Sequence, residues 1–366
     1  MKTEYTLGAV LFALVVAGLV YLFVSPSSTM TTEQQQTDEM TSEVVTNTET
    51  VRGNYKEIVN PSGFVNTDGI TIKELVGKKV IMIDFLTYSC INCQRTFPYI
   101  NAWYEKYKDQ GLEIIGIHTP EFAFEKNINN VREAMKRFGI THPIVLDNDY
   151  STWNEYGNQY WPRKYIIDIH GNVVYDHIGE GGYEETETKI RELLKERAEV
   201  LNTTVADMSG GLSSSAIIEV KNNAKSPETY FGSLRNKYLA NGAIGRSGEQ
   251  TLSLPAMPTN NALYLGGVWN INPEYAETVS DASVVYKYTA KEVYIVADAD
   301  TLTNVEVTQD DKPVGADGGE DVDSLGVVKM KESRLYKLIN NSVSGEHVLK
   351  LKLKSKGLRL YAFTFG

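Results

Sequence analysis

The middle of the chain alternates continuous apolar runs with segments of helical spacing. Runs such as residues 79–85 (KVIMIDF) are typical of strands that are buried on both faces. Segments such as residues 91–108, with apolar side chains on one helical face, predict helices. The predicted strands are 79–85, 113–117, 143–146, 164–168 and 173–178, and the predicted helices are 91–108, 125–138 and 184–199. For residues 51–200 this order predicts an α/β fold, with a mixed central sheet and helices on both faces.

The pattern changes after residues 201–225, a stretch rich in Ser, Gly and Asn that we interpret as a linker. In residues 226–366, short alternating runs are separated by Gly, Asp and Pro, which predicts an all-β sandwich. The clearest runs are residues 283–288, 292–296, 304–308, 347–353 and 358–365. We expect this domain to fold independently and to make few contacts with residues 51–200.

An uncharged, mostly apolar segment at residues 6–24 precedes these domains. Its length is close to the roughly 20 residues that a helix needs to cross a bilayer. Because Lys2 lies before it and no other basic residue follows until Arg52, we expect residues 1–24 to be a membrane anchor with the remainder outside the cytoplasm. A cleaved signal peptide is the alternative and predicts the same location. Residues 25–50, rich in Ser, Thr and Gln, predict a disordered tether.

Composition narrows the classes of function. The 366 residues carry a formal net charge of −11, so the chain offers no basic face to a phosphate backbone and we expect no nucleic-acid partner. The chain has two cysteines, which excludes a scaffold held by several disulfides and an all-cysteine zinc site. The chemistry must therefore come from a single cysteine pair or from other side chains.

The two cysteines form the motif Cys90-Ile91-Asn92-Cys93, where a predicted buried strand passes into a predicted helix. At a helix amino terminus, free N–H groups and the helix dipole stabilise a thiolate, so Cys90 is the expected nucleophile. Cys93 lies one turn later and is the expected resolving thiol, able to close a disulfide with Cys90. The alternatives are a permanent structural disulfide and a zinc site. No second pair of ligands stands at a suitable spacing, and we expect neither a metal nor a cofactor.

Two further positions qualify as site residues. Asp84 is the only charge in its apolar run, so burial should raise its pKa and suit it to accept the proton of Cys93. The alternative is an aspartate that faces water on an edge strand. Pro162 follows Trp161 just before a predicted strand, and a cis peptide there would leave the Trp161 backbone free to pair with substrate. From spacing alone, a trans proline in a loop is favoured.

Taken together, these motifs resemble the TlpA-like group of membrane-anchored, extracytoplasmic thiol-disulfide oxidoreductases, which have a thioredoxin-like fold. The resemblance covers residues 61–196 and is most specific to the soluble carboxy-terminal region of DipZ proteins. The motifs that carry it are DFLTYSCINCQRT (84–96), HTPEFAFE (118–125), LDNDY (146–150), YWP (160–162) and GEGGY (179–183). The resemblance implies that Pro162 is the cis-proline of the family.

The resemblance continues beyond the linker. The motifs SPETYFG (226–232), RLY (334–336) and YAFTFG (361–366) are similar to the β-sandwich that follows the thioredoxin part of DipZ. That module resembles carbohydrate-binding jelly rolls in fold, which implies a glycan or a protein as its ligand, although a fold alone does not assign one.

The sequence departs from its relatives in two places. DipZ proteins carry a multi-helix membrane domain that transfers electrons, whereas this chain has one candidate span. Its electron donor is therefore expected to be a separate membrane protein, such as a CcdA-like protein. Several cytochrome-maturation relatives place a glutamate three residues after the second cysteine, where this chain has Thr96.

The leading hypothesis is a membrane-tethered enzyme that exchanges disulfides with the thiols of protein substrates. One alternative on the same fold is a thiol peroxidase, because Thr87 precedes Cys90 by three residues, although Ile83 stands where its motif has proline. Another alternative is a copper-delivery protein that uses the two cysteines and His118. Such proteins usually separate the cysteines by three residues, whereas this chain separates them by two.

Overall fold

The computed structural model describes residues 54–204 and 224–366. The expected anchor (1–24), the expected tether (25–50) and most of the expected linker (201–225) lie outside the described residues. Within the described part, no helix has the length and apolar character needed to cross a membrane.

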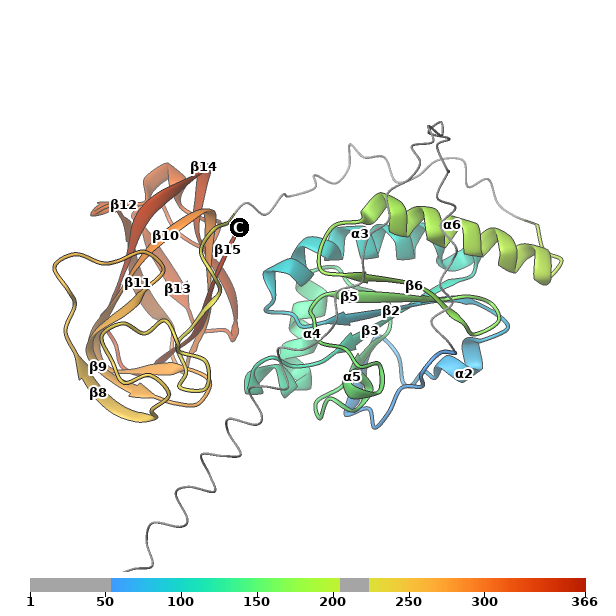
Figure 1. The fold of residues 1–366 in the computed structure, drawn as a ribbon, viewed down its shortest axis with the longest axis horizontal. Coiled ribbons are helices and arrows are strands. Elements are labelled where there is room, and N and C mark those ends of the chain that lie inside the picture. Colours follow the sequence, from blue (N-terminus) through green and yellow to red (C-terminus); the bar gives the residue numbers. More distant parts are fainter. Residues whose placement is uncertain (1–53, 205–223) are drawn as a thin grey trace, which may run out of the picture. The chain divides into compact units, whose positions relative to one another are not determined.

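Within residues 54–204, six strands form one sheet in the order β1-β4-β3-β2-β5-β6 (Figure 1). Strands β2, β3 and β4 pair in parallel, whereas β1, β5 and β6 join by antiparallel pairing. The strands are β1 (Gly63–Val65), β2 (Val80–Leu86), β3 (Leu112–His118), β4 (Ile144–Leu146), β5 (Arg163–Ile167) and β6 (Val173–Ile178). The predicted mixed sheet is confirmed, and β1 is a strand that the sequence pattern did not predict.

Helices cover both faces of this sheet, as predicted (Figure 1). The helices are α2 (Ile72–Leu75), α3 (Ile91–Tyr107), α4 (Ile128–Arg137), α5 (Ser151–Glu155) and α6 (Tyr183–Val200), with 3-10 turns η1 (Lys108–Gln110) and η2 (Ala123–Lys126). Apolar side chains of α3 and α6 pack with Val80 and Met82 of β2. Those of α2 and α5 pack with the alternate residues Ile81 and Ile83. Because side chains alternate along a strand, Asp84 belongs to the same face of β2 as Met82.

Residues 224–366 form an antiparallel nine-stranded sheet system (Figure 1). Its strands are β7 (Thr229–Tyr230), β8 (Gly248–Leu252), β9 (Leu263–Ile271), β10 (Ala276–Ala299), β11 (Thr303–Gln309), β12 (Lys312–Pro313), β13 (Val327–Met330), β14 (Arg334–Leu353) and β15 (Leu358–Phe365), with a 3-10 turn η3 (Gly315–Asp317). The separate runs predicted at 283–288 and 292–296 are one strand, β10. The chain stays extended between them and absorbs the change of pattern in a register shift between Ala290 and Glu292.

This β-rich part has a core of its own, which includes the fully buried Trp269, Tyr286 and Phe363. It also contacts residues 54–204 through a second apolar cluster. In that cluster, Ile91 and Phe122 meet Tyr294, Val296, Leu335, Tyr361 and Ala362. Independent folding of residues 226–366 stays a prediction. The apolar pattern of a strand does not reveal which of its faces a distant loop will cover.

Candidate active site

The Cys-Ile-Asn-Cys motif lies between the end of β2 and the start of α3. Cys90 is the N-cap residue of α3, with extended backbone angles (φ −79°, ψ 121°) and no capping hydrogen bond from its side chain. It is partly exposed, whereas Cys93 is completely buried, and the two thiols are not bonded to each other. The helix dipole favours a thiolate at the Cys90 position. An accessible sulfur at a helix amino terminus therefore stands one turn from a shielded one.

The surroundings of Cys93 keep its thiol protonated. It packs against Leu86 and Phe97 in an apolar cluster. Burial is the main cause that raises the pKa of Cys93 well above its ordinary value, and the hydrogen bond with Cys90 and the nearby Asp84 carboxylate add to it. A thiol with a raised pKa attacks a disulfide slowly unless a base removes its proton. The site therefore requires a proton acceptor near Cys93.

Asp84 is the acceptor that the sequence predicts, and this role stays a prediction. Its side chain is 1% exposed on β2, on the face that α3 covers, so the alternative of a water-facing edge aspartate is wrong. Neither carboxylate oxygen has a hydrogen-bond partner among the described residues. Burial raises the pKa of Asp84 to about 6, partly opposed by the positive charge of Lys164. Close to neutral pH such a carboxylate both takes up and releases a proton, as general base catalysis needs.

Lys164 is a residue of this site that the sequence analysis missed. It is the register partner of Asp84 across the β2–β5 pair and is fully buried. Burial lowers the pKa of Lys164, while Asp84 and Cys93 oppose that change. Its ammonium group has no hydrogen-bond partner among the described residues. The signal in the sequence is weaker than the one for Asp84, because Arg163 and Asp168 flank Lys164 in and beside the same short strand.

The loop that precedes β5 brings Trp161 to the site. The Trp161–Pro162 peptide bond is cis, as the family resemblance implied and contrary to the trans form favoured by spacing alone. The Trp161 ring packs on Trp153, with 4.3 Å between ring centroids. Trp161 lines a pocket that also contains Cys90, whereas Pro162 is buried behind it. Their predicted role in substrate binding stays a prediction.

The side chain of Glu125 holds the turn that carries Cys90. Fully buried, it accepts hydrogen bonds from Ser89 Oγ at 2.7 Å and from the backbone N–H groups of Ser89, Glu121 and Phe122. It therefore ties the residue before Cys90 to the loop after β3. His118 is also fully buried, where it stacks on Tyr88, and burial lowers its pKa to about 3. These two groups support the site from beneath and do not face the pocket.

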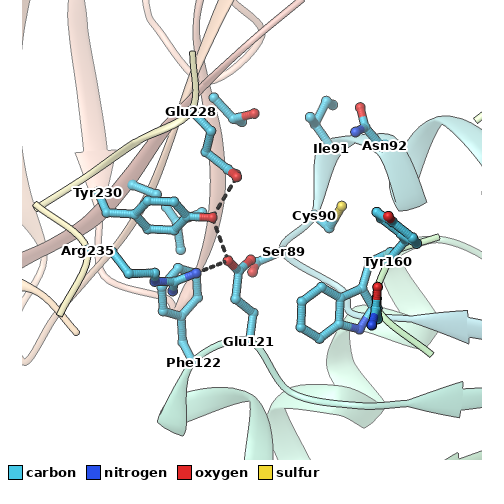
Figure 2. Close-up of a pocket in the computed structure, with 15 residues that line it drawn as sticks. Ser89, Cys90, Ile91, Asn92, Glu121, Phe122, Tyr160, Glu228, Tyr230 and Arg235 are labelled. Carbon is cyan, nitrogen blue, oxygen red and sulfur yellow. Dashed lines mark hydrogen bonds and ion pairs between the residues drawn. The ribbon is translucent and has the colours of Figure 1, made fainter. Parts of the chain in front are cut away.

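The pocket beside Cys90 has a volume of about 260 Å³ and is lined from both parts of the chain (Figure 2). One group of lining residues comes from residues 54–204: Ser89, Cys90, Ile91, Asn92, Glu121, Phe122, Gln159, Tyr160 and Trp161. The other comes from residues 224–366: Glu228, Tyr230, Arg235, Val296, Ala362 and Thr364. The sequence analysis assigned none of the second group to the site, because no local motif marks them.

Comparison with known proteins places this geometry in a family. The Redoxin family matches residues 64–194, and the family described as thioredoxin like C-terminal domain matches residues 226–366. Protein DipZ of Mycobacterium tuberculosis (strain CDC 1551 / Oshkosh) is 36% identical over 86% of this chain and 43% of its own length. The chain thus spans less than half the length of that relative.

Two further relatives share the first part. Thiol-disulfide oxidoreductase ResA of Halalkalibacterium halodurans is 33% identical over 36% of this chain and 70% of its own length. A solved structure, that of a thioredoxin-like protein in the oxidized form, is 26% identical and covers 40% of this chain and 97% of its own, with a TM-score of 0.37. The chain belongs to the thioredoxin-like thiol-disulfide oxidoreductases. Within that family it is similar to DipZ across both of its parts, so the resemblance inferred from the motifs is confirmed.

Proposed function

We propose that this protein exchanges disulfides with protein substrates through Cys90 and Cys93. The observation that carries the proposal is the pairing of an accessible sulfur at the start of α3 with a fully buried one a single turn later. The first can attack a substrate, and the second is shielded from everything except the first.

In the reducing direction, the Cys90 thiolate attacks a substrate disulfide, forms a mixed disulfide and releases one substrate thiolate. Cys93 then gives its proton to Asp84 and attacks the Cys90 sulfur. The Cys90–Cys93 disulfide forms and the second substrate thiolate leaves, so the substrate gains two electrons and the enzyme loses two. The reverse sequence oxidises a substrate dithiol. The potential of the Cys90–Cys93 couple sets the direction.

The same proposal includes the cellular setting. The uncharged apolar segment at residues 6–24 and the polar stretch at 25–50 support a membrane tether with the catalytic part outside the cytoplasm. A separate membrane protein of the CcdA-like kind would then supply electrons, and a jelly-roll-like carboxy-terminal part would bind a glycan or a protein. Membrane fractionation, with protease protection of intact cells or spheroplasts, tests the location: a pool in the cytosol would contradict it.

A trapping experiment tests the exchange reaction. The Cys93→Ser variant should keep the first attack and accumulate mixed disulfides, because no thiol remains to resolve them. The Cys90→Ser variant should form none, since its remaining thiol is buried. Non-reducing electrophoresis after acid quenching shows both outcomes. Normal turnover by the Cys93→Ser variant would overturn the assigned roles.

A further inference from the structure

The pocket is lined by two carboxylates, Glu121 from the first part and Glu228 from the carboxy-terminal part, and by one cation, Arg235. The Tyr230 hydroxyl lies 2.5 Å from Glu228 Oε2 and 2.8 Å from Glu121 Oε1 (Figure 2). A hydroxyl carries one hydrogen, so it can donate to only one of these carboxylates at a time. The other carboxylate needs another donor.

Arg235 forms an ion pair with Glu121 and leaves Glu228 without an ion pair of its own. Its Nη1 lies 2.7 Å from Glu121 Oε1, and its guanidinium carbon lies 3.6 Å from the centre of the Tyr230 ring. In residues 54–204 and 224–366, no lysine or arginine forms an ion pair with Glu228. Desolvation of the Glu228 carboxylate and the nearby Glu121 carboxylate raise the pKa of Glu228 to about 7. Two carboxylates therefore share one cation at the rim of the pocket.

The position of this group relative to Cys90 is held by packing. Ile91, between the two cysteines, is 7% exposed because the carboxy-terminal part covers it with Val296 and Ala362. On the next turn of α3, Arg95 Nη2 lies 2.9 Å from Glu292 Oε2 of β10. The Arg95 side chain is 8% exposed. Glu228, Tyr230 and Tyr160 therefore line the same pocket as Cys90 (Figure 2).

We propose that residues 226–366 supply the substrate-selecting wall of the active site, and that Glu228 selects disulfides with a positive charge next to the reacting sulfur. The inference rests on the proposed function, since it takes Cys90 as the reacting atom. A volume of about 260 Å³ is smaller than the pockets that bind drug-sized ligands, so it accepts one flanking side chain or a small disulfide. The protein substrates are those with lysine or arginine beside the cysteine.

Small disulfides of similar length separate charge from shape. The probes are cystamine (two ammonium groups), bis(2-hydroxyethyl) disulfide (neutral) and 3,3′-dithiodipropionate (two carboxylates). Each oxidises the reduced protein, is itself cleaved to two thiols, and leaves the Cys90–Cys93 disulfide. The measured quantity is the second-order rate constant for oxidation of the reduced protein by each charged probe, divided by that for the neutral probe in the same variant, at pH 8. Comparing this ratio between variants cancels the intrinsic reactivity of each probe.

Replacing the carboxylate tests the selection directly. The Glu228→Gln variant should lower the cystamine ratio about threefold relative to the unaltered protein, as expected for a partly solvated charge pair, and should raise the dithiodipropionate ratio. The Glu249→Gln variant, at an exposed position on β8 outside the pocket, should change neither ratio. A cystamine ratio in Glu228→Gln equal to that of the unaltered protein would overturn the inference.

A second measurement does not depend on the folding of a variant. In the unaltered protein, raising the salt concentration should reduce the cystamine ratio, because ions screen a charge pair at the rim of a pocket. A ratio independent of salt would also overturn the inference. If no probe oxidises the protein, the proposed function fails. If all three probes react and the ratios change neither with salt nor in the Glu228→Gln variant, the inference about substrate selection fails and the proposed function stands.

Discussion

The two walls of the pocket beside Cys90 are built in different ways. The wall from residues 54–204 consists of short segments that each adjoin a strand end: the motif after β2, the loop after β3 and the loop before β5. The wall from residues 224–366 gathers scattered side chains from β7, β10, β15 and the segments on either side of β7. The first wall contains the sulfur and lies over the buried carboxylate, and the second contains neither.

This difference separates chemistry from selection. The reacting groups need exact placement relative to the backbone, which a strand end and a helix start provide locally. The groups that select a substrate need only line the pocket. If this division is correct, substitutions in the first wall and beneath it should change the rates of disulfide exchange and proton transfer. Substitutions of residues that contact the second part, or that belong to it, should change stability and the choice of substrate.

The largest effect is expected at the base beneath the first wall. The Asp84→Asn variant should slow resolution of the mixed disulfide by about 100-fold or more, because Cys93 loses its proton acceptor. In the unaltered protein the resolving rate should rise with pH through about 6 as Asp84 ionises. Rapid-quench kinetics of a preformed mixed disulfide measure this step. The Asp109→Asn variant, at an exposed position of η1, is the control. Equal resolving rates in Asp84→Asn and the unaltered protein would remove Asp84 from the mechanism.

The ionised carboxylate of Asp84 should lower the free energy of unfolding. The pKa of Asp84 is raised from 3.8 to about 6 by folding, so the folded state holds a proton that the unfolded state has released between these values. Stability therefore falls as pH rises through this window, and the ionised carboxylate costs about 3 kcal/mol above it. Asp84→Asn should raise the free energy of unfolding by about that amount at pH 8 and by little at pH 3. Denaturant titrations at both pH values decide this: a variant less stable at pH 8 would contradict a desolvated carboxylate.

The bond that joins the two parts is expected to have an intermediate effect. Arg95→Leu removes the ion pair with Glu292, which keeps its contact with Lys337, and also the longer pair of Arg95 with Glu180 in the first part. The free energy of unfolding should fall by about 2 kcal/mol, as for a buried hydrogen bond between charged groups. Lys108→Leu, which removes a surface pair with Glu105, should cost under about 0.5 kcal/mol. If both variants lose the same stability, the second wall is not fixed to the first by Arg95.

The smallest effect is expected from replacing Lys164, and it tests whether the charge of this residue acts on Asp84. Its charge opposes the rise in the pKa of Asp84, so Lys164→Met should raise that pKa further. The midpoint of the resolving-rate profile should then move to higher pH, with little change in its plateau. Lys73→Met, at an exposed position of α2, should leave the midpoint in place. A midpoint that moves to lower pH would show that Lys164 does not act on Asp84 through its charge.

Much of the first part follows from local pattern. The apolar run with one acid predicts a buried strand, and Asp84 is indeed 1% exposed on β2. The Cys-Ile-Asn-Cys motif predicts a helix start, and Cys90 is the N-cap of α3. The second part was predicted less well. β10 runs through what appeared in the sequence as a break, because a strand tolerates a register shift without ending.

The sequence by itself determined the groups of the candidate active site: two thiols at a strand-to-helix junction and a lone carboxylate in the strand before them. These groups lie within ten residues, so backbone geometry alone brings them together. Only the tertiary structure decided which charge lies opposite Asp84 and which side chains face Cys90 across the pocket. Tyr230 and Glu121 are 109 positions apart, and their hydrogen bond depends on how two separately formed cores pack. No local pattern encodes such a contact, since each residue satisfies its own strand or loop equally well without the other.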